Sequence, residues 1–264
     1  MIFPDIDPIA LNLGFFQIRW YALAYLTGFL GGWFYAVRLT RLYTNDIRPH
    51  AEDIENLVTW VVLGVIFGGR FGYVLFYNIG YFLEHPMEVF YLWQGGMSFH
   101  GGMLGVLIAL VGYTKYHNIS LLRTGDIICS VVPIGLFCGR LSNFVNAELF
   151  GRTTDVPWGV IFPNGGPLPR HPSQLYEAFF EGGVLLILLG VLMYKTRLRE
   201  TPGVIAGIFF IGYGLARFGI EFVREPDAHL GFIFSFLSMG QILSIPMIIF
   251  GSGLIFYARR YVRS

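Results

Sequence analysis

Long apolar stretches constrain the fold of this chain more than any other feature of its sequence. A helix needs about 20 predominantly apolar residues to cross the hydrocarbon core of a bilayer. Stretches of that kind recur along the whole chain, separated by charged residues or by Pro and Gly. They cover residues 18–37, 55–77, 97–114, 125–146, 173–194, 203–222 and 237–258. The sequence therefore predicts an all-α, polytopic membrane helical bundle with about seven transmembrane helices.

The scarcity of charge supports the same class. Only 13% of the 264 residues are charged and 55% are hydrophobic, whereas about a quarter of the residues in a soluble domain are charged. A soluble domain of this length could not cover its surface with so few charges. The net charge of +1 and the absence of a Lys/Arg run argue against nucleic acid as a partner. We expect a single integral membrane domain over residues 1–264.

The basic residues between the stretches predict the orientation, because cytoplasmic loops are rich in Lys and Arg. If the C-terminus is cytoplasmic, that side receives Arg38, Arg41, Arg48, Lys115, Arg123, Lys195, Arg197, Arg199, Arg259, Arg260 and Arg263. The other side keeps Arg19, Arg152, Arg170 and Arg224. We therefore expect the N-terminus outside, with a small head segment at about 147–172 on the outer face. Met1–Phe16 has no basic region, so we expect an extended or interfacial lead-in and not a cleavable signal peptide.

Several ionisable residues fall inside the apolar stretches, where they are costly and usually mark function or a paired cluster. They include Arg70 and two groups with helical spacing, Glu177 with Glu181, and Arg217 with Glu221 and Arg224. One interpretation is a network of ion pairs that joins helices. The other is an anion site. We expect arginines to outnumber the buried carboxylates near Arg140 and Arg224, which favours an external phosphate because a guanidinium binds it in a bidentate manner.

A polar stripe ends the fourth stretch, within the segment Gly139–Arg152. Arg140, Asn143, Asn146 and Glu148 recur there at short helical steps. Amides, a guanidinium and a carboxylate on one stripe form a donor-rich surface. We interpret this stripe as a ligand-contact site.

His100 opens the third stretch beside Gly101 and Gly102, which leaves room for close approach. It is a candidate general base, and the alternative is a structural histidine. No other His or Cys has the spacing of a metal site, and no Gly-Xaa-Ser-Xaa-Gly motif is present. The sequence predicts neither a metal nor a cofactor.

Ordered blocks along the chain resemble one known family, the bacterial phosphatidylglycerol–prolipoprotein diacylglyceryl transferases. The blocks are Trp20-Tyr21, Gly68–Tyr73, Gly96–Gly102, Gly139–Gly151, Arg170–Glu177, Glu221–Asp227 and Ser238–Gln241. The resemblance runs nearly end to end. The chain departs from it at Pro157–Pro169, which looks shorter than in some members.

The resemblance implies a reaction and two membrane-anchored substrates. It implies that a diacylglyceryl group passes from phosphatidylglycerol to the lipobox cysteine thiol in the signal peptide of a preprolipoprotein, with release of glycerol 1-phosphate. It also implies a multi-pass protein of the bacterial cytoplasmic (inner) membrane. Because the nucleophile is a thiol of the substrate, the protein needs no catalytic Ser or Cys.

The resemblance further implies roles for nine residues. Arg140 and Arg224 would bind the phosphate and stabilise its departure, and His100 would accept the thiol proton, with Glu148 as the alternative base or as a residue that orients Arg140. The remaining residues would bind or position the lipid: Tyr21, Arg70, Asn143, Asn146 and Gly151. Arg70 in Gly69-Arg70 would be a device similar to Gly139-Arg140, or would only pair with a carboxylate.

Two other function classes also place charges in a membrane bundle. A transporter of an anionic or lipid substrate is expected to have repeated halves and helix breaks near the midplane, whereas the polar residues here gather near one face. An intramembrane protease needs a Ser/His pair, an Asp/Asp pair or a metal-ligand set, which these stretches lack.

Overall fold

The computed structural model describes residues 1–264 except 15–16, 45, 226–231, 234–236 and 262–264. Arg263 and Asp227, which the sequence analysis named, therefore lie outside the described residues. The chain forms two compact units. The first unit combines Met1–Leu42 with Gly125–Ser264, and the second is Tyr43–Thr124. The expectation of one domain over residues 1–264 stays a prediction.

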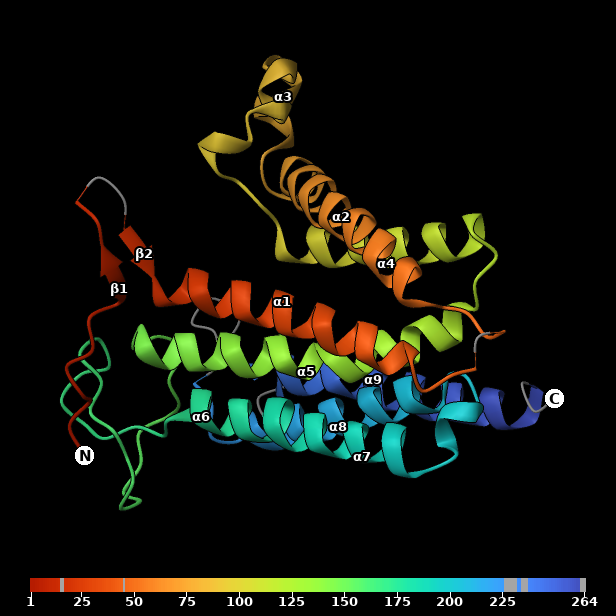
Figure 1. Ribbon diagram of the computed structural model, residues 1–264. Helices are drawn as coiled ribbons and strands as arrows, with labels where there is room; N and C mark the ends of the chain where they lie inside the picture. Colours follow the sequence, from red (N-terminus) through yellow and green to blue (C-terminus); the bar gives the residue numbers. More distant parts are fainter. Residues whose placement is uncertain (15–16, 45, 226–231, 234–236, 262–264) are drawn as a thin grey trace. The chain divides into compact units, whose positions relative to one another are not determined.

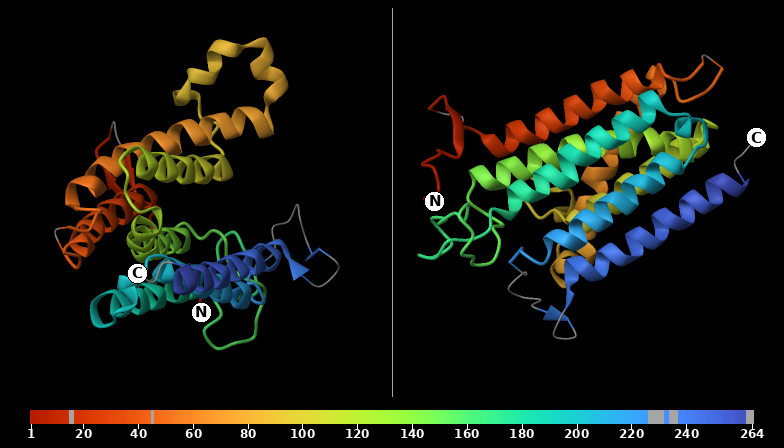
Figure 2. Two further views of the ribbon diagram at one scale, coloured as in Figure 1. Left: turned by 90° about the vertical axis from the view of Figure 1, so that its right-hand side faces the viewer. Right: turned by 90° about the horizontal axis from the view of Figure 1, so that it is seen from below.

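The first unit is a bundle of long helices that run side by side (Figures 1 and 2). In chain order it contains α1 (Trp20–Thr40), α5 (Leu121–Val145), α6 (Ser173–Glu177), the π-helix η3 (Ala178–Val184), α7 (Leu185–Lys195), the short 3-10 helix η4 (Leu198–Glu200), α8 (Val204–Ile220) and α9 (Met239–Tyr261). The first four residues of α5 precede the boundary of the unit. Its interior is apolar, with fully buried side chains that include Leu39, Leu189, Met193 and Ile205.

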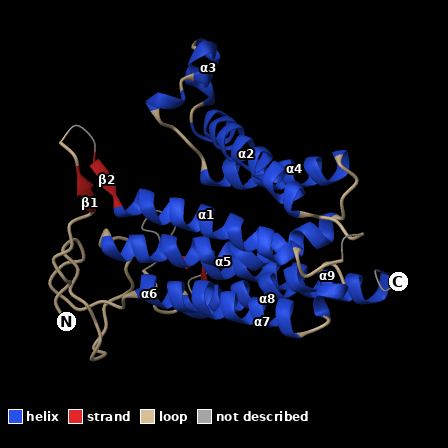
Figure 3. Cartoon of the chain, in the orientation of Figure 1, coloured by secondary structure: helices blue, strands red, loops and turns tan. Residues whose placement is uncertain are grey.

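Short strands flank the bundle (Figure 3). Strand β1 (Ile9–Asn12) pairs with β2 (Gln17–Arg19) in an antiparallel ladder that sets Ile9 opposite Arg19 and Asn12 opposite Gln17. Strand β3 (Phe232–Ile233) pairs with β4 (Leu237–Ser238). The expectation of an extended lead-in at the N-terminus is confirmed at β1. The strict all-α expectation is wrong in this detail, because backbone pairing of a few residues does not need a long β-pattern in the sequence.

The segment that links α5 to α6 folds around a small apolar cluster. Isolated bridges pair Thr153 and Val160 with Arg170, and Ile161 with Ile2 of the N-terminal segment. Phe162 is buried at the centre, and the cluster contains Ala147, Val160 and Phe162, with Phe3, Phe144 and Phe150 packed against them. The predicted head segment at about 147–172 is therefore a folded connection that rests on the end of α5. Its place outside a membrane stays a prediction.

The second unit consists of two crossing helices and a short connecting arm. Its elements are α2 (Ala51–Tyr77), α3 (Ile79–Glu84), the 3-10 helices η1 (Pro86–Phe90) and η2 (Leu92–Gln94), and α4 (Phe99–Tyr116). Glycines line the crossing of α2 and α4. A Cβ atom added at Gly72 would lie 2.6 Å from the Cα atom of Gly101, and one added at Gly105 would overlap the carbonyl oxygen of Gly64. The two backbones therefore touch directly, as small residues allow in membrane helices.

Each of the seven predicted apolar stretches contains a helix in the described part of the chain. Four helical segments are long and apolar enough to cross a membrane: Ala51–Tyr77, Leu121–Val145, Ser173–Lys195 and Met239–Tyr261. The apolar helix Val204–Ile220 is shorter. A helical membrane protein is thus confirmed in its coarse features, and the number of seven spans stays a prediction.

Candidate active site

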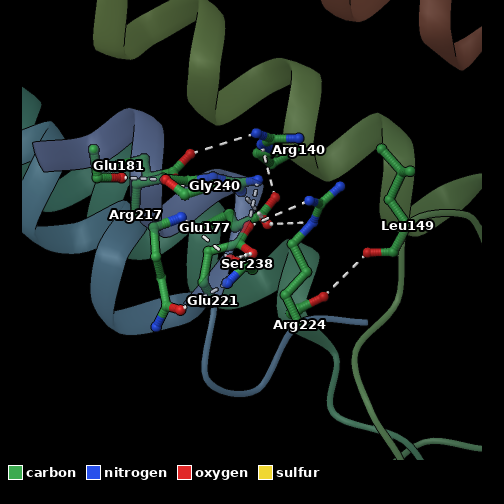
Figure 4. Close-up of polar contacts among 12 residues, drawn as sticks. Arg140, Leu149, Glu177, Glu181, Arg217, Glu221, Arg224, Ser238 and Gly240 are labelled. Carbon is green, nitrogen blue, oxygen red and sulfur yellow. Dashed lines mark hydrogen bonds and ion pairs between the residues drawn. The ribbon is translucent and has the colours of Figure 1, made fainter. Parts of the chain in front are cut away.

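A group of buried charges in the first unit, here called the charge cluster, joins several helices (Figure 4). Arg140 comes from α5, Glu177 from α6 and Glu181 from η3, while the remaining members come from α8 and the residues just after it. The members are Arg140, Arg217, Arg224, Glu177, Glu181 and Glu221. Every glutamate side chain in the cluster is at most 2% exposed.

Local helix geometry brings these residues together. Glu177 ends α6, and Glu181 follows within the π-helix η3, a rare element that is frequent at functional sites. A Cβ atom added at Gly182 would lie 2.6–2.9 Å from atoms of Phe137 on α5. The missing side chain thus lets η3 and α5 touch. Arg140 lies three residues after Phe137 and reaches both glutamates.

Two of the three carboxylates are firmly held. Glu177 accepts a hydrogen bond of 2.9 Å from Arg217, and Nε of Arg140 lies 2.8 Å from its second oxygen. Glu221 lies 2.6 Å from Nη2 of Arg217 and accepts a hydrogen bond of 2.6 Å from Ser238. Glu181 is different, because its nearest cations are Arg140 at 3.6 Å and Arg217 at 3.8 Å.

These contacts decide between the two interpretations of the buried charges. The ion-pair interpretation is confirmed for Glu177, Glu181, Arg217 and Glu221. The expectation that arginines outnumber the carboxylates beside Arg140 and Arg224 is wrong, because three glutamates face three arginines in the cluster. The sequence could not reveal this balance, because it depends on how far α5, η3 and α8 are rotated about their axes.

Arg140 keeps donor capacity despite its ion pairs. Neither Glu177 Oε2 nor either oxygen of Glu181 accepts a hydrogen bond, so the N–H groups of Arg140 are not directed at these atoms. With 20% of its side chain exposed, Arg140 is also the most exposed arginine of the cluster, compared with 14% for Arg217 and 11% for Arg224.

The predicted polar stripe is present at the end of α5. The Asn143 amide donates a hydrogen bond of 2.8 Å to Glu148 Oε1, and the Asn146 amide donates one of 3.4 Å to the same oxygen. Ala147 and Leu149, on either side of Glu148, have positive φ angles of 51° and 57°. Such backbone is strained in residues other than glycine and persists where neighbours hold it. Here the Gln174 amide donates to the carbonyl of Glu148, and the Ser173 hydroxyl donates to that of Leu149.

Gly151 connects this stripe to Arg224. Its backbone pairs with Arg224 in an antiparallel bridge, and its N–H donates to the carbonyl of His171. A Cβ atom at Gly151 would lie 2.5 Å from the Val223 carbonyl oxygen and 2.7 Å from Cβ of His171. The prediction that Gly151 permits a close backbone approach is confirmed. Arg152 adds a second connection, because its guanidinium donates to the carbonyls of Arg224 and Glu221.

The His171 ring beside Gly151 belongs to an uncharged contact. Trp158 Nε1 donates a hydrogen bond of 2.6 Å to the Tyr176 hydroxyl, which lies 3.3 Å from Nδ1 of His171. Burial lowers the pKa of His171 and thereby favours the neutral ring. The connection between Gly151 and Arg224 therefore carries no histidine charge at neutral pH.

Tyr21 lies near the start of α1, with its hydroxyl 3.0 Å from that of Tyr25. The hydroxyl is within electrostatic reach of the Glu148 carboxylate, and 40% of the residue is exposed. The first unit therefore brings Tyr21 toward the polar stripe, as a head-group role requires.

Arg70 and His100 belong to the second unit. Arg70 donates to the carbonyls of Val89, Glu88 and Gly95 at 2.5–2.7 Å, stacks over Phe82 and is only 4% exposed. The alternative that Arg70 pairs with a carboxylate is wrong, since its partners are backbone carbonyls of the arm. These contacts indicate a structural role and weaken its predicted role in substrate binding, which stays untested.

His100 is the second residue of α4 and is exposed. The Ser98 hydroxyl caps this helix by accepting a hydrogen bond of 3.2 Å from the N–H of Gly101. A position in the first turn of a capped helix gives the imidazole a fixed base. Its role as a proton acceptor stays a prediction.

Comparisons with known proteins identify the family to which this site belongs. The family model described as "Prolipoprotein diacylglyceryl transferase" matches residues 8–257. The chain belongs to this family. Among its relatives, phosphatidylglycerol–prolipoprotein diacylglyceryl transferase of Rhodospirillum rubrum is 54% identical over 98% of this chain and 94% of its own length. The proteins of the same name from Azospirillum brasilense and Paramagnetospirillum magneticum are 54% and 50% identical, over 98% of this chain and 96% of each relative.

Within this member of the prolipoprotein diacylglyceryl transferase family, the sequence analysis missed the role of Ser238. Its hydroxyl donates to Glu221 and also accepts the N–H of Gln241, whose side chain accepts the N–H of Ser238. The reciprocal pair is a capping box at the start of α9, and the spacing Ser-Xaa-Xaa-Gln before an apolar stretch is its sequence signal. Gly240 leaves room for the contact, because a Cβ atom there would lie 2.5 Å from Cδ of Glu221.

No three His, Cys, Asp or Glu side chains in the described part of the chain are arranged to hold a metal ion. The chemistry of this family member is therefore considered with its own side chains. The predictions of no metal and no cofactor stay predictions.

Proposed function

We propose that this chain transfers the diacylglyceryl group of phosphatidylglycerol to the thiol of a lipobox cysteine in a preprolipoprotein. The observation that carries the proposal is the family match over residues 8–257, together with relatives of that printed name at about half identity across nearly the whole chain. The rival class, a transporter of anionic or lipid substrates, has no comparable support.

The reaction forms a C–S bond and breaks a C–O bond at the glyceryl carbon. The thiol loses its proton, and glycerol 1-phosphate departs with the electron pair of the broken bond. Charge therefore builds up on the phosphate as it leaves, and fixed cations in a poorly solvated site stabilise that charge. The protein must also help to form the thiolate, which is the reactive form of cysteine.

Arg140 is the phosphate ligand in this proposal, and Arg224 assists it. The support for Arg140 is that Glu177 Oε2 and Glu181 leave its N–H groups undirected, and that it is the most exposed arginine of the cluster. Arg224 is held beside the polar stripe by the backbone bridge to Gly151 and by Arg152. A planar guanidinium with undirected N–H groups suits a phosphodiester in bidentate fashion.

The other predicted residues act around the phosphate. Asn143, Asn146 and Tyr21 position the glycerol head group, and Glu148, which accepts from both amides, orients them. Gly151 keeps the stripe and Arg224 in register. His100 accepts the thiol proton, with Glu148 as the alternative acceptor.

The proposed setting is the bacterial cytoplasmic membrane, with seven spans, the N-terminus and head segment outside and the C-terminus in the cytoplasm. It is supported by the Lys/Arg distribution and by the helices found at all seven apolar stretches. A site near the outer face would admit a lipid sideways and a membrane-anchored peptide from outside.

A reconstituted transfer assay tests the function. Purified protein in nanodiscs is given phosphatidylglycerol and a lipobox peptide, and mass spectrometry follows the peptide. We expect a diacylglyceryl adduct on the cysteine peptide and none on the matched peptide with serine at that position, with glycerol 1-phosphate released in equal amount. Release of glycerol 1-phosphate without an adduct, or an adduct on serine, would contradict the proposal.

A further inference from the structure

Glu181 is a buried carboxyl group that the proposed chemistry leaves without a task. Its side chain has no exposed surface, and neither of its oxygens accepts a hydrogen bond. A buried carboxylate is normally stabilised by several hydrogen bonds or by a close cation, since desolvation disfavours its charge. Glu181 has only Arg140 at 3.6 Å and Arg217 at 3.8 Å.

The charge balance of the cluster makes this weakness consequential. Three arginines face three glutamates, so the cluster is neutral when all six groups are ionised. A phosphodiester that binds at Arg140 adds one negative charge to this poorly solvated region. It also draws the guanidinium of Arg140 toward the phosphate and weakens the support that Glu181 receives. An unbalanced buried charge is costly, and a carboxyl group avoids that cost by binding a proton.

Glu181 is the member of the cluster that binds this proton at the lowest cost. Glu177 has a hydrogen bond from Arg217, and Glu221 has one from Ser238 together with its close ion pair to Arg217. Both contacts stabilise the ionised form, and Glu181 has no equivalent.

We propose that the Glu181 carboxyl group takes up one proton when the phosphodiester of the lipid donor binds at Arg140. The charged and titratable groups that face Glu181 are Arg140 from α5, Glu177 from α6, Arg217 and Tyr213 from α8, and Arg224 after α8. Protonation leaves Arg140 paired with the phosphate while the region stays neutral. Glu181 is then a positioning residue, because it acts through Arg140 and touches no reacting atom. The inference rests on the proposed function.

Proton linkage tests this proposal without a turnover assay. The full-length protein in phosphatidylcholine nanodiscs is titrated with a short-chain phosphatidylglycerol, and calorimetry in two buffers of different ionisation enthalpy yields the protons taken up per lipid bound. A phosphodiester stays a monoanion near neutral pH, so the lipid itself does not titrate. We expect the wild-type protein to take up close to one proton, and its Kd to rise by about tenfold per pH unit above neutrality.

Two variants locate the proton. Glu181→Gln mimics the protonated carboxyl group, so we expect it to bind the lipid with no proton uptake and with a Kd that does not change with pH. Glu225→Gln, which removes a half-exposed carboxylate outside the cluster, should take up the proton as the wild type does.

The outcomes separate this proposal from the proposed function. Lipid binding by the wild type without proton uptake overturns the role of Glu181 and leaves the transferase proposal intact, and so does uptake that persists in Glu181→Gln. If Glu181→Gln fails to fold, the pH dependence of the wild-type Kd decides, and a constant Kd overturns the proposal. Failure of the wild type to bind phosphatidylglycerol would contradict both.

Discussion

At the scale of single residues, the most consequential feature is that Arg140 is paired by charge but not by hydrogen bonding. Its guanidinium neutralises Glu177 and Glu181 without directing N–H groups at Glu177 Oε2 or at Glu181. A phosphate can therefore use the directional bonds of Arg140 while the protein keeps part of the electrostatic contact. A lysine would preserve the charge and lose the planar, forked geometry.

The first prediction concerns this geometry. We expect Arg140→Lys to reduce kcat/KM in the transfer assay by about 10²- to 10³-fold, the size of effect seen when one donor to a developing anion is removed. Arg259→Lys, at an exposed position near the end of α9, serves as the control and should keep full activity. Near-normal turnover of Arg140→Lys would reduce Arg140 to a packing residue.

The second prediction concerns the proton acceptor. If His100 is the base, His100→Gln should lose most of kcat, and its remaining rate should climb with pH because a free thiol, with a pKa of about 8.5, ionises unaided. Rates measured across a pH series with purified variants distinguish the roles. A lower yield of folded His100→Gln with an unchanged pH–rate curve would move the assignment to Glu148 or to water.

Residue types were predictable from the sequence, but their partners were not. Gly69-Arg70 and Gly139-Arg140 look alike in the sequence, yet Arg70 binds carbonyls of the arm and Arg140 faces the charge cluster. The difference comes from segments about 20 to 40 residues away in the chain. The stripe of Arg140, Asn143, Asn146 and Glu148 was visible because its spacing is local to one helix end.

At the scale of elements, contacts between glycine backbones set the distances at which helices cross. The α2–α4 crossing in the second unit is the closest case, because Gly64, Gly68 and Gly105 meet backbone to backbone. Their spacing was visible in the sequence, but which glycines face a partner was not. The π-helix η3 was also unpredictable, since its sequence reads as a regular apolar helix.

The third prediction follows from this crossing. Gly105→Ala places a methyl group onto the carbonyl oxygen of Gly64, so we expect destabilisation of about 1–3 kcal/mol, as in other overpacked sites. Gly112→Ala on the same helix is the matched control, because its Cβ atom would lie 3.6 Å from the Trp60 ring, an ordinary contact. Thermal unfolding in detergent should separate the two variants. Equal melting temperatures would contradict the crossing geometry.

At the scale of the whole molecule, the apolar stretches predicted where the helices form to within a few residues. The number of membrane spans and their orientation stay predictions, because helix length and hydropathy alone single out four segments. The division of the chain into two compact units was not predicted, since the sequence has no polar linker at either boundary.

The fourth prediction is topological. After Cys129→Ala and Cys138→Ala, single cysteines are introduced by Asn164→Cys in the head segment and by Glu200→Cys at the end of η4, both at exposed positions. Because the Lys/Arg distribution puts the η4 side in the cytoplasm, an impermeant thiol reagent on intact spheroplasts should label position 164 and not position 200. The reverse pattern would overturn the orientation.

An experimental structure of the protein with phosphatidylglycerol bound tests most directly whether Arg140 is the phosphate site. We predict density for the lipid phosphate within hydrogen-bond distance of the Arg140 guanidinium, with Arg224 next to it and Asn143 and Asn146 facing the glycerol. The decisive feature is the partner of the Arg140 N–H groups. A head group bound elsewhere in the bundle, with Arg140 still closed onto Glu177 and Glu181, would contradict the assignment.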